Sequence, residues 1–272
     1  MKENAAEILA SKKLYIFDMD GTIYLGGIVF DYAIRYIKRL RKAGKRVMFF
    51  TNNASRSTSR YEEKLTRLGF EPTPEEIMSS ADVTVAFLKT HYPEKKVYLV
   101  GTKELYEHFS EAGIPLATGE EESVDIVITS FDTELTYKKL DDACRLIRNG
   151  AVYLCTHPDF NCPTETGFMP DSGAIAALVT ASTNVTPRYL GKPYPEVVDM
   201  IEKVTGIDRA DMCIFGDRLY TDIALGAHNG VCSVLVLSGE STLEDMEKLD
   251  EGDRPDFVFP SLDEVDKLMF GD

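Results

Sequence analysis

The chain has 272 residues, of which 44% are hydrophobic and 28% are charged, as in folded globular proteins of one or two domains. Its 30 basic and 45 acidic side chains leave a formal net charge of -15, the wrong sign for gripping a phosphate backbone, so we expect no nucleic acid partner. No segment approaches the roughly 20 consecutive apolar residues of a membrane-spanning helix, so we expect no membrane partner either.

Short apolar runs alternate with segments of helical periodicity, which is the pattern of strand and helix units on a parallel sheet. The predicted strands are Leu14–Phe17, Val47–Phe50, Val97–Val100, Ile126–Thr129, Val152–Cys155, Cys213–Phe215 and Ser233–Leu237. The predicted helices are Ala33–Leu40 with an end at Gly44, Lys103–Glu111, Tyr137–Arg148, a helix starting near Ala174, about Pro195–Val204 and about Thr221–His228. The fold class is therefore α/β.

The N-terminal segment and the cysteines indicate the cellular compartment. Residues Met1–Lys13 include acidic side chains and no apolar stretch before a cleavage site, so we expect a cytoplasmic protein. The cysteines are odd in number and form no C-x-x-C pair, which argues against a disulfide framework and a zinc site. We expect free buried thiols at Cys144, Cys155, Cys162, Cys213 and Cys232. A homo-oligomer is left open.

Three polar clusters follow predicted strands, at the end where open parallel sheets bind ligands. They are Asp18-Met19-Asp20-Gly21-Thr22, Thr51-Asn52-Asn53, and Gly216-Asp217 with Asp222. If these strands are neighbours, four carboxylates share one place, and a cation must offset their repulsion. An all-oxygen acidic set suits Mg²⁺. Helix capping explains one such cluster easily, but it explains three clusters at three strand ends much less readily.

Two aspartates separated by one residue can take different parts in one reaction. Asp18 is a candidate nucleophile toward a phosphoryl group, and Asp20 is a candidate acid and base. The charge of Asp18 repels an anionic substrate, and a Mg²⁺ shared with Asp217 would offset that repulsion.

The same chemistry needs hydrogen-bond donors and a positive charge around the phosphoryl oxygens. Thr51 and the backbone N–H groups of Asn52 and Asn53 are candidate donors, and Lys192 is the candidate cation. A lone lysine in a loop is more often solvated surface, but Lys192 lies between two rigidifying neighbours just before a predicted helix.

In chain order, these residues resemble the four motifs of the haloacid dehalogenase superfamily. The long segment between Asn53 and Lys192 resembles the subgroup with a large cap inserted between the second and third motifs, the NagD and 4-nitrophenylphosphatase-like proteins. Further matches to this subgroup are Thr51-Asn52-Asn53-Ala54-Ser55, Asp132 with Tyr137-Lys138-Lys139-Leu140, and Gly191-Lys192-Pro193. The resemblance implies a Rossmann-like parallel-sheet core domain of residues 1–78 and 186–272, with an inserted α/β cap domain of residues 79–185.

The resemblance implies a Mg²⁺-dependent phosphatase that hydrolyses small phosphorylated metabolites, such as sugar phosphates, nucleotides or 4-nitrophenyl phosphate, through an aspartyl-phosphate. In this scheme Asp18 is the nucleophile, and Asp20 protonates the leaving group and then activates water. The implied metal-binding set is Asp18, Asp20 through its carbonyl, Asp217 and, as a nearby support, Asp222. The implied phosphate-binding set is Thr51, Asn52, Asn53 and Lys192. Dehalogenases of the superfamily lack the second aspartate and the metal, so Asp20 and Asp217 favour phosphate chemistry.

Within the expected cap, Thr156-His157-Pro158-Asp159-Phe160 stands where relatives often have Thr-Asn-x-Asp, so His157 is a departure. The loop Phe168–Gly173 is similar to the family's substrate-facing loop. The candidate cap residues are Asp159, Pro170, Asp171, Ser172 and Gly173. An ordinary turn with Ser172 as the helix cap explains this loop equally well, and a lone histidine is more often structural than catalytic.

Other functions use a similar set of residues. A phospho-accepting signalling receiver also has an aspartate pocket with Mg²⁺, but it lacks the Asp18 to Asp20 spacing and the large inserted block. A phosphotransferase or mutase on the same core would keep every residue named so far and differ in its acceptor. A silent binding module is disfavoured by the intact acidic residues, and an ion-pumping ATPase needs membrane spans.

Overall fold

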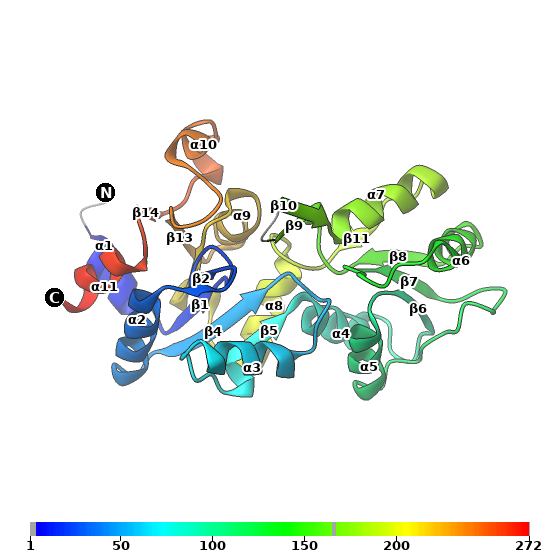
Figure 1. Cartoon of the computed structure of the whole chain (residues 1–272), viewed down its shortest axis with the longest axis horizontal. Coiled ribbons are helices and arrows are strands. Elements are labelled where there is room, and N and C mark those ends of the chain that lie inside the picture. The colour runs from blue at the N-terminus through cyan, green and yellow to red at the C-terminus, as the bar shows by residue number, and fades with distance from the viewer. Residues whose placement is uncertain (1–3, 165–166, 272) are drawn as a thin grey trace. The chain divides into compact units, whose positions relative to one another are not determined.

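The computed structural model describes residues 4–164 and 167–271. Its elements, shown in Figure 1, fall into two compact units. The first unit comprises Met1–Thr51, Tyr61–Met78 and Lys192–Asp272, and the second comprises Asn52–Arg60 and Ser79–Gly191. The chain therefore passes between the units after Thr51, Arg60, Met78 and Gly191. The division into domains expected from the sequence, 1–78 with 186–272 and 79–185, stays a prediction.

The first unit is built on a six-stranded sheet. In spatial order its strands are β14 (Phe257–Phe259), β13 (Cys232–Val236), β12 (Met212–Gly216), β1 (Leu14–Phe17), β4 (Arg46–Thr51) and β5 (Ile77–Ser79). Strand β1 pairs in parallel with both β4 and β12, and β13 pairs in parallel with β12 and β14. The carboxyl ends of β1, β4 and β12 therefore meet at one edge of the sheet.

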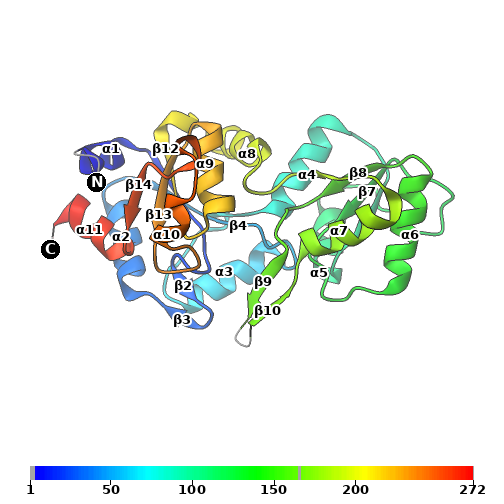
Figure 2. The ribbon, with the colours of Figure 1, turned by 90° about the horizontal axis from the view of Figure 1, so that it is seen from above.

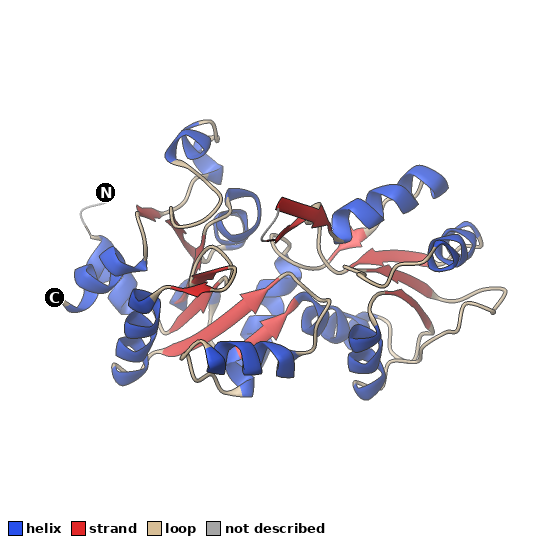
Figure 3. Cartoon of the chain, viewed as in Figure 1, coloured by secondary structure: helices blue, strands red, loops and turns tan. Residues whose placement is uncertain are grey.

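Helices flank this sheet (Figure 3), and every residue of β1 is buried, as expected of a parallel strand covered on both faces. The helices are α1 (Ala5–Ser11), α2 (Asp31–Lys42), α3 (Thr58–Arg67), which begins in the second unit, α8 (Pro195–Thr205), α9 (Ala224–Asn229), α10 (Leu243–Glu247) and α11 (Leu262–Phe270). Helices α2 and α11 pack side by side (Figure 2). The apolar face of α2, which includes Tyr36 and Ile37, packs into a core that contains Phe17, Phe49 and Phe215.

Short elements complete the first unit. They are the antiparallel pair β2 (Tyr24–Leu25) and β3 (Ile28–Val29), the 3-10 turns Pro74–Glu76, Arg209–Asp211 and Glu251–Asp253, and a π-helical turn over Leu219–Ile223. The π-helical turn corrects the helix predicted over Thr221–His228, because the N–H of Ile223 bonds to the Arg218 carbonyl at 3.2 Å and α9 begins only at Ala224. Such turns often mark functional sites.

The second unit has its own parallel sheet of four strands. Their order is β11 (Arg188–Tyr189), β8 (Val152–Cys155), β7 (Ile126–Thr129) and β6 (Val97–Val100). Its helices are α4 (Ser80–His91), α5 (Lys103–Glu111), α6 (Tyr137–Arg148) and α7 (Ser172–Thr183), and its antiparallel hairpin is β9 (Asn161–Thr164) with β10 (Gly167–Pro170). Two clusters of buried apolar side chains, one including Leu99 and Phe109 and the other Val127 and Leu146, form its core. The two parallel sheets confirm the α/β fold class.

All five cysteines are free thiols, as expected, but Cys162 lies in the β9–β10 hairpin and is only partly buried. The expectation of a buried thiol is therefore wrong at that position. None of the helices formed by the described residues has the length and apolarity needed to cross a bilayer.

Candidate active site

Two neighbouring strands bring Asp18 and Asp217 to the same edge of the first sheet. Phe17 ends β1 and pairs with Phe215 of β12, so the next residues of both strands, Asp18 and Gly216, leave the sheet together. The N–H of Asp18 donates to the Phe215 carbonyl at 2.9 Å. The first and third polar clusters of the sequence thus converge.

Lys192 lies among these carboxylates, inside the first unit. Its ammonium group donates to Asp18 Oδ1 and to Asp222 Oδ1, each at 2.6 Å, and its side chain is 2% exposed. Burial alone would lower the pKa of Lys192, but Asp18 and Asp222 raise it above its ordinary value. A buried ammonium is tolerated only when it is paired in this way, so Lys192 is a fixed cation of the site and not a surface lysine.

The Asp217 carboxylate packs against the backbone of two glycines, Gly21 and Gly239. Its Oδ2 accepts a hydrogen bond from the Glu240 N–H at 2.7 Å, whereas its Oδ1 is buried with no hydrogen-bond partner. A Cβ built on Gly239 would lie 2.0 Å from Asp217 Oδ2, and one on Gly21 would lie 2.3 Å from the same atom. A side chain at either place would displace the Asp217 carboxylate, and the orphaned Oδ1 is available to a ligand.

The carboxylates crowd one another. One ligand atom from each of Asp18, Asp217 and Asp222 lies within 4.8 Å of the others. Burial raises the pKa of Asp18 against the opposing effect of Lys192, and Asp222 adds to the rise. Burial, followed by Asp222, also raises the pKa of Asp217. A divalent cation with oxygen ligands would offset this repulsion and satisfy Asp217 Oδ1, so the residues present fit Mg²⁺.

The loop after β1 places Asp20 beside the same sheet edge. Asp20 is partly buried, and its backbone forms a bridge with Tyr24. Ser238, which follows β13, donates a hydrogen bond to the Gly21 carbonyl at 2.7 Å. Asp222 packs on Gly216, where a Cβ would lie 2.1 Å from the Asp222 Cβ. Sequence reasoning missed the contribution of residues 238–240, although this polar segment directly follows a predicted strand.

The second polar cluster spans the boundary of the units. Thr51 ends β4 in the first unit, next to β1, and Asn52 and Asn53 belong to the second. The Asn52 side-chain amide donates to the two carboxylate oxygens of Asp159 at 3.2 and 3.3 Å. Asn53 Oδ1 accepts from the Ser55 N–H at 2.9 Å, which closes a local turn. Both side chains already have hydrogen-bond partners, so the predicted contribution to phosphate binding rests on backbone N–H groups.

The candidate cap residues lie around the start of α7. Asp171 is its N-cap, with Oδ1 accepting the Ser172 N–H at 2.6 Å, so the expectation of Ser172 as the cap is wrong. Asp171 Oδ1 also lies 2.9 Å from His157 Nε2. Gly173 packs so closely on the Pro158 carbonyl that a Cβ would lie 2.1 Å from its oxygen. Pro170 is exposed at the end of β10.

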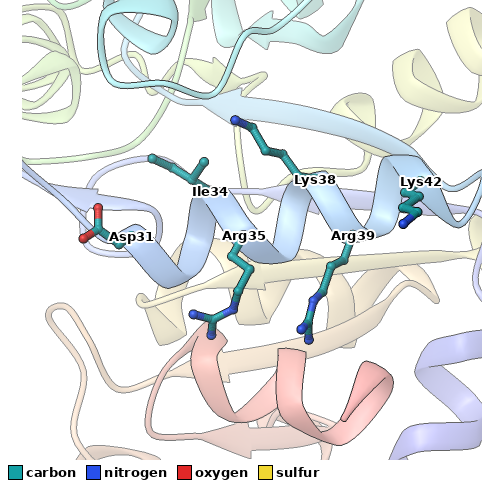
Figure 4. A pocket seen from close by; sticks show the side chains of 6 residues that line it. All are labelled: Asp31, Ile34, Arg35, Lys38, Arg39 and Lys42. Atoms are coloured by element: carbon teal, nitrogen blue, oxygen red, sulfur yellow. The ribbon is translucent and has the colours of Figure 1, made fainter. Parts of the chain in front are cut away.

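A surface hollow lies elsewhere in the first unit, along one helix (Figure 4). It is lined by Asp31, Ile34, Arg35, Lys38, Arg39 and Lys42 of α2. Arg35 and Arg39 form ion pairs with Asp266 of α11. The hollow contains none of the site residues predicted from the sequence.

Comparisons with known proteins identify the family of the chain. The family model of the haloacid dehalogenase-like hydrolases matches residues 15–115, and a second family model, of HAD-like hydrolases, matches residues 189–265. The chain is 34% identical over 253 residues to an acid sugar phosphatase of Staphylococcus aureus, covering 93% of this chain and 96% of that one. This chain belongs to the haloacid dehalogenase-like hydrolases.

Solved structures of phosphatases superpose on most of this chain. A 4-nitrophenylphosphatase from Thermotoga maritima superposes with a TM-score of 0.91 at 38% identity, covering 96% of this chain and 99% of that one. A glycerol phosphate phosphatase from Mycobacterium tuberculosis, solved in complex with magnesium, superposes with a TM-score of 0.87 at 28% identity, covering 94% and 76%. The predicted membership of the NagD and 4-nitrophenylphosphatase-like subgroup is confirmed, and this hydrolase is a phosphatase.

Proposed function

We propose that the chain is a Mg²⁺-dependent phosphatase that hydrolyses small phosphorylated metabolites through an aspartyl-phosphate on Asp18. The observation that carries the proposal is the buried contact of Lys192 with Asp18, next to an Asp217 oxygen that has no hydrogen-bond partner. The names of the relatives, an acid sugar phosphatase, a 4-nitrophenylphosphatase and a glycerol phosphate phosphatase, support phosphomonoesters as the substrate class.

The first step is an attack by Asp18. One of its carboxylate oxygens bonds to phosphorus while the bond between phosphorus and the leaving oxygen breaks. Asp20 gives its proton to that oxygen, which departs as an alcohol. Lys192 orients the Asp18 carboxylate and offsets part of its charge, so that an anionic phosphoryl group can approach.

The second step reverses these roles. Asp20, now ionised, takes a proton from a water molecule whose oxygen bonds to phosphorus. The bond from phosphorus to Asp18 breaks, which releases inorganic phosphate and restores the carboxylate. Asp18, Asp217 and the carbonyl of Asp20 would hold the Mg²⁺, with Asp222 as support, and the bound ion would supply positive charge toward the phosphoryl oxygens.

Phosphate release tests the proposal. The substrates are 4-nitrophenyl phosphate and a panel of sugar, glycerol and nucleotide phosphates, each assayed with Mg²⁺ or with EDTA. We expect wild type to complete many turnovers with Mg²⁺ and none with EDTA. Asp18→Asn should show no turnover, although its circular dichroism spectrum should match that of wild type. Transfer of the phosphoryl group to an added sugar in preference to water would instead indicate a phosphotransferase. A stable phosphorylated Asp18 without turnover would indicate a signalling receiver.

A further inference from the structure

His157 is a buried side chain to which the proposed reaction assigns no role. It is fully shielded from solvent, and both ring nitrogens face polar groups of the second unit. Nε2 lies 2.9 Å from Asp171 Oδ1, and Nδ1 lies 2.9 Å from Thr156 Oγ1 and 3.4 Å from Ser80 Oγ. Because Asp171 Oδ1 already accepts the Ser172 N–H, we infer that Nε2 is the donor in the contact with Asp171.

The groups around His157 belong to the segments by which the chain passes between the units. Asn52 is the first residue after one passage, Ser80 is the second residue after another, and Gly191 is the last residue before a third. Ser80 Oγ donates to the Asn52 carbonyl at 2.5 Å. A Cβ on Gly191 would lie 2.7 Å from both His157 Cβ and Asn52 Oδ1. We call His157, Asn52, Ser80 and Gly191 the crossing cluster, and all four belong to the second unit.

The crossing cluster adjoins the groups that the proposed function uses. Asn52 directly follows Thr51, and Gly191 directly precedes Lys192, which contacts Asp18. Asn52 is held from a second side by Asp159, which lies two residues after His157. Ser80, which holds the Asn52 carbonyl, lies beside the His157 ring, and Gly191 packs on His157 Cβ. Both segments therefore contact His157, and Asp171 fixes the orientation of its ring.

A metal ion at this place is a weaker explanation. Ligand atoms of His157, Asp159 and Asp171 lie within 4.8 Å of one another. However, Asp171 already accepts the Ser172 N–H and Asp159 accepts the Asn52 amide. These hydrogen bonds already account for the three groups without an ion.

We propose that His157, held by Asp171, is a positioning residue for the phosphatase reaction. It fixes the backbone of Asn52 and Gly191, and through them the placement of Thr51 and Lys192. This inference rests on the proposed function. An asparagine at position 157 reaches the place of Nδ1 but not that of Nε2, so it keeps the contacts with Thr156 and Ser80 and loses the contact with Asp171. A leucine loses all of them.

Kinetics of three variants test the inference. Removing all three ring contacts in His157→Leu should lower kcat/KM for 4-nitrophenyl phosphate on the order of ten- to a hundredfold and weaken competitive inhibition by inorganic phosphate. His157→Asn should retain most of both properties. The control is Tyr153→Phe, which removes a buried hydroxyl 3.1 Å from Thr129 Oγ1 in the sheet of the same unit. It should lose stability with kcat/KM unchanged. Wild-type kcat/KM and phosphate inhibition in folded His157→Leu would overturn the inference.

Hydrogen exchange separates this inference from the proposed function. We expect the backbone amide hydrogens of residues 51–53 and 190–192 to exchange faster in His157→Leu than in wild type, and at the wild-type rate in Tyr153→Phe. This result would support the positioning role even if the wild-type protein hydrolysed no substrate. Equal exchange in the two variants would overturn it. Should His157→Leu fail to fold, His157→Gln replaces it, because a glutamine places its amide toward Asp171 and away from the position of Nδ1. We then expect faster exchange and weaker phosphate inhibition in His157→Gln than in His157→Asn, and identical values in wild type and both variants would overturn the inference.

Discussion

The ammonium group of Lys192 lies 2.6 Å from Asp18 Oδ1, although the two residues are 174 positions apart in the chain. The same ammonium lies 2.6 Å from Asp222 Oδ1. A single buried cation thus joins the strand-end loops of β1 and β12, and it pairs with two of the three neighbouring aspartates.

Replacing Lys192 by methionine should lower the free energy of unfolding and abolish the phosphatase activity. The substitution leaves Asp18 and Asp222 buried without their cation, which typically costs about 3–5 kcal/mol. Urea unfolding in EDTA measures the change in the free energy of unfolding. Lys138→Met is the control, because Lys138 also pairs with an aspartate, Asp142, but is 73% exposed, so its stability should hardly change. Equal stability of the two variants would contradict the account.

An alanine at position 239 should weaken Mg²⁺ binding. The new Cβ would lie 2.0 Å from Asp217 Oδ2, so the carboxylate must move. We expect Gly239→Ala to need a higher Mg²⁺ concentration for half-maximal phosphate release. Gly252→Ala is the matched control, since a Cβ added there would meet no heavy atom within 4 Å beyond its own chain neighbours. An unchanged Mg²⁺ requirement in Gly239→Ala would place the ion elsewhere.

Mg²⁺ should stabilise the wild-type fold and not the Asp217→Asn variant. An ion that binds only the folded state adds about 2.7 kcal/mol at roughly a hundred times its Kd. Thermal unfolding with Mg²⁺ and with EDTA measures the difference, and Mg²⁺ should raise the wild-type Tm. The Tm of Asp217→Asn should rise far less, because a neutral amide is a poorer ligand than a carboxylate. A rise of the same size in both proteins would contradict the assigned ligand.

The His108–Asp82 pair should give the second unit a pH-dependent contribution to stability. His108 Nε2 lies 3.2 Å from Asp82 Oδ1, and this contact raises the pKa of His108 above its ordinary value against the effect of burial. A raised folded-state pKa means that the folded chain holds the proton more tightly than the unfolded chain. The contribution is therefore complete below the unfolded-state pKa of about 6.5 and is lost as the pH rises through the folded-state value.

Unfolding free energies of wild type and His108→Asn, compared across pH, measure that contribution. The difference between them should be largest at acidic pH and should shrink toward alkaline pH. His228→Asn serves as a control, since its contact with Asp253 is exposed. A difference that grows with pH would show that the sign is wrong.

The sequence was most informative where one short apolar run lies between clear turn residues. Strands β6, β7 and β8 have the predicted bounds, and α5 and α6 begin after the N-cap residues Thr102 and Thr136 as their periodicity indicates. The same logic brought Asp18 and Asp217 together, because parallel strands that neighbour each other must deliver their following residues to one edge. Lys192 follows no strand of that sheet, and its place between Gly191 and Pro193 just before a predicted helix singled it out instead.

The missed features depend on tertiary contacts. The β9–β10 hairpin contains Pro163, Gly167 and Pro170, which favour turns over strands in a single sequence. The contact of His157 with Asp171 joins residues 14 positions apart across that hairpin. Asp171 displaces Ser172 as the helix cap because its carboxylate serves the backbone and the imidazole at once. Such shared hydrogen bonds leave no periodic pattern in the sequence.

Covalent trapping tests the central claim most directly. The protein is mixed with Mg²⁺ and a phosphorylated substrate that it turns over, quenched in acid within one turnover, digested and analysed by mass spectrometry. The account predicts a phosphoryl group on the peptide that contains Asp18 in wild type, and none on that peptide in Asp18→Asn. A phosphoryl group on another residue, or undiminished turnover by Asp18→Asn, would contradict Asp18 as the nucleophile.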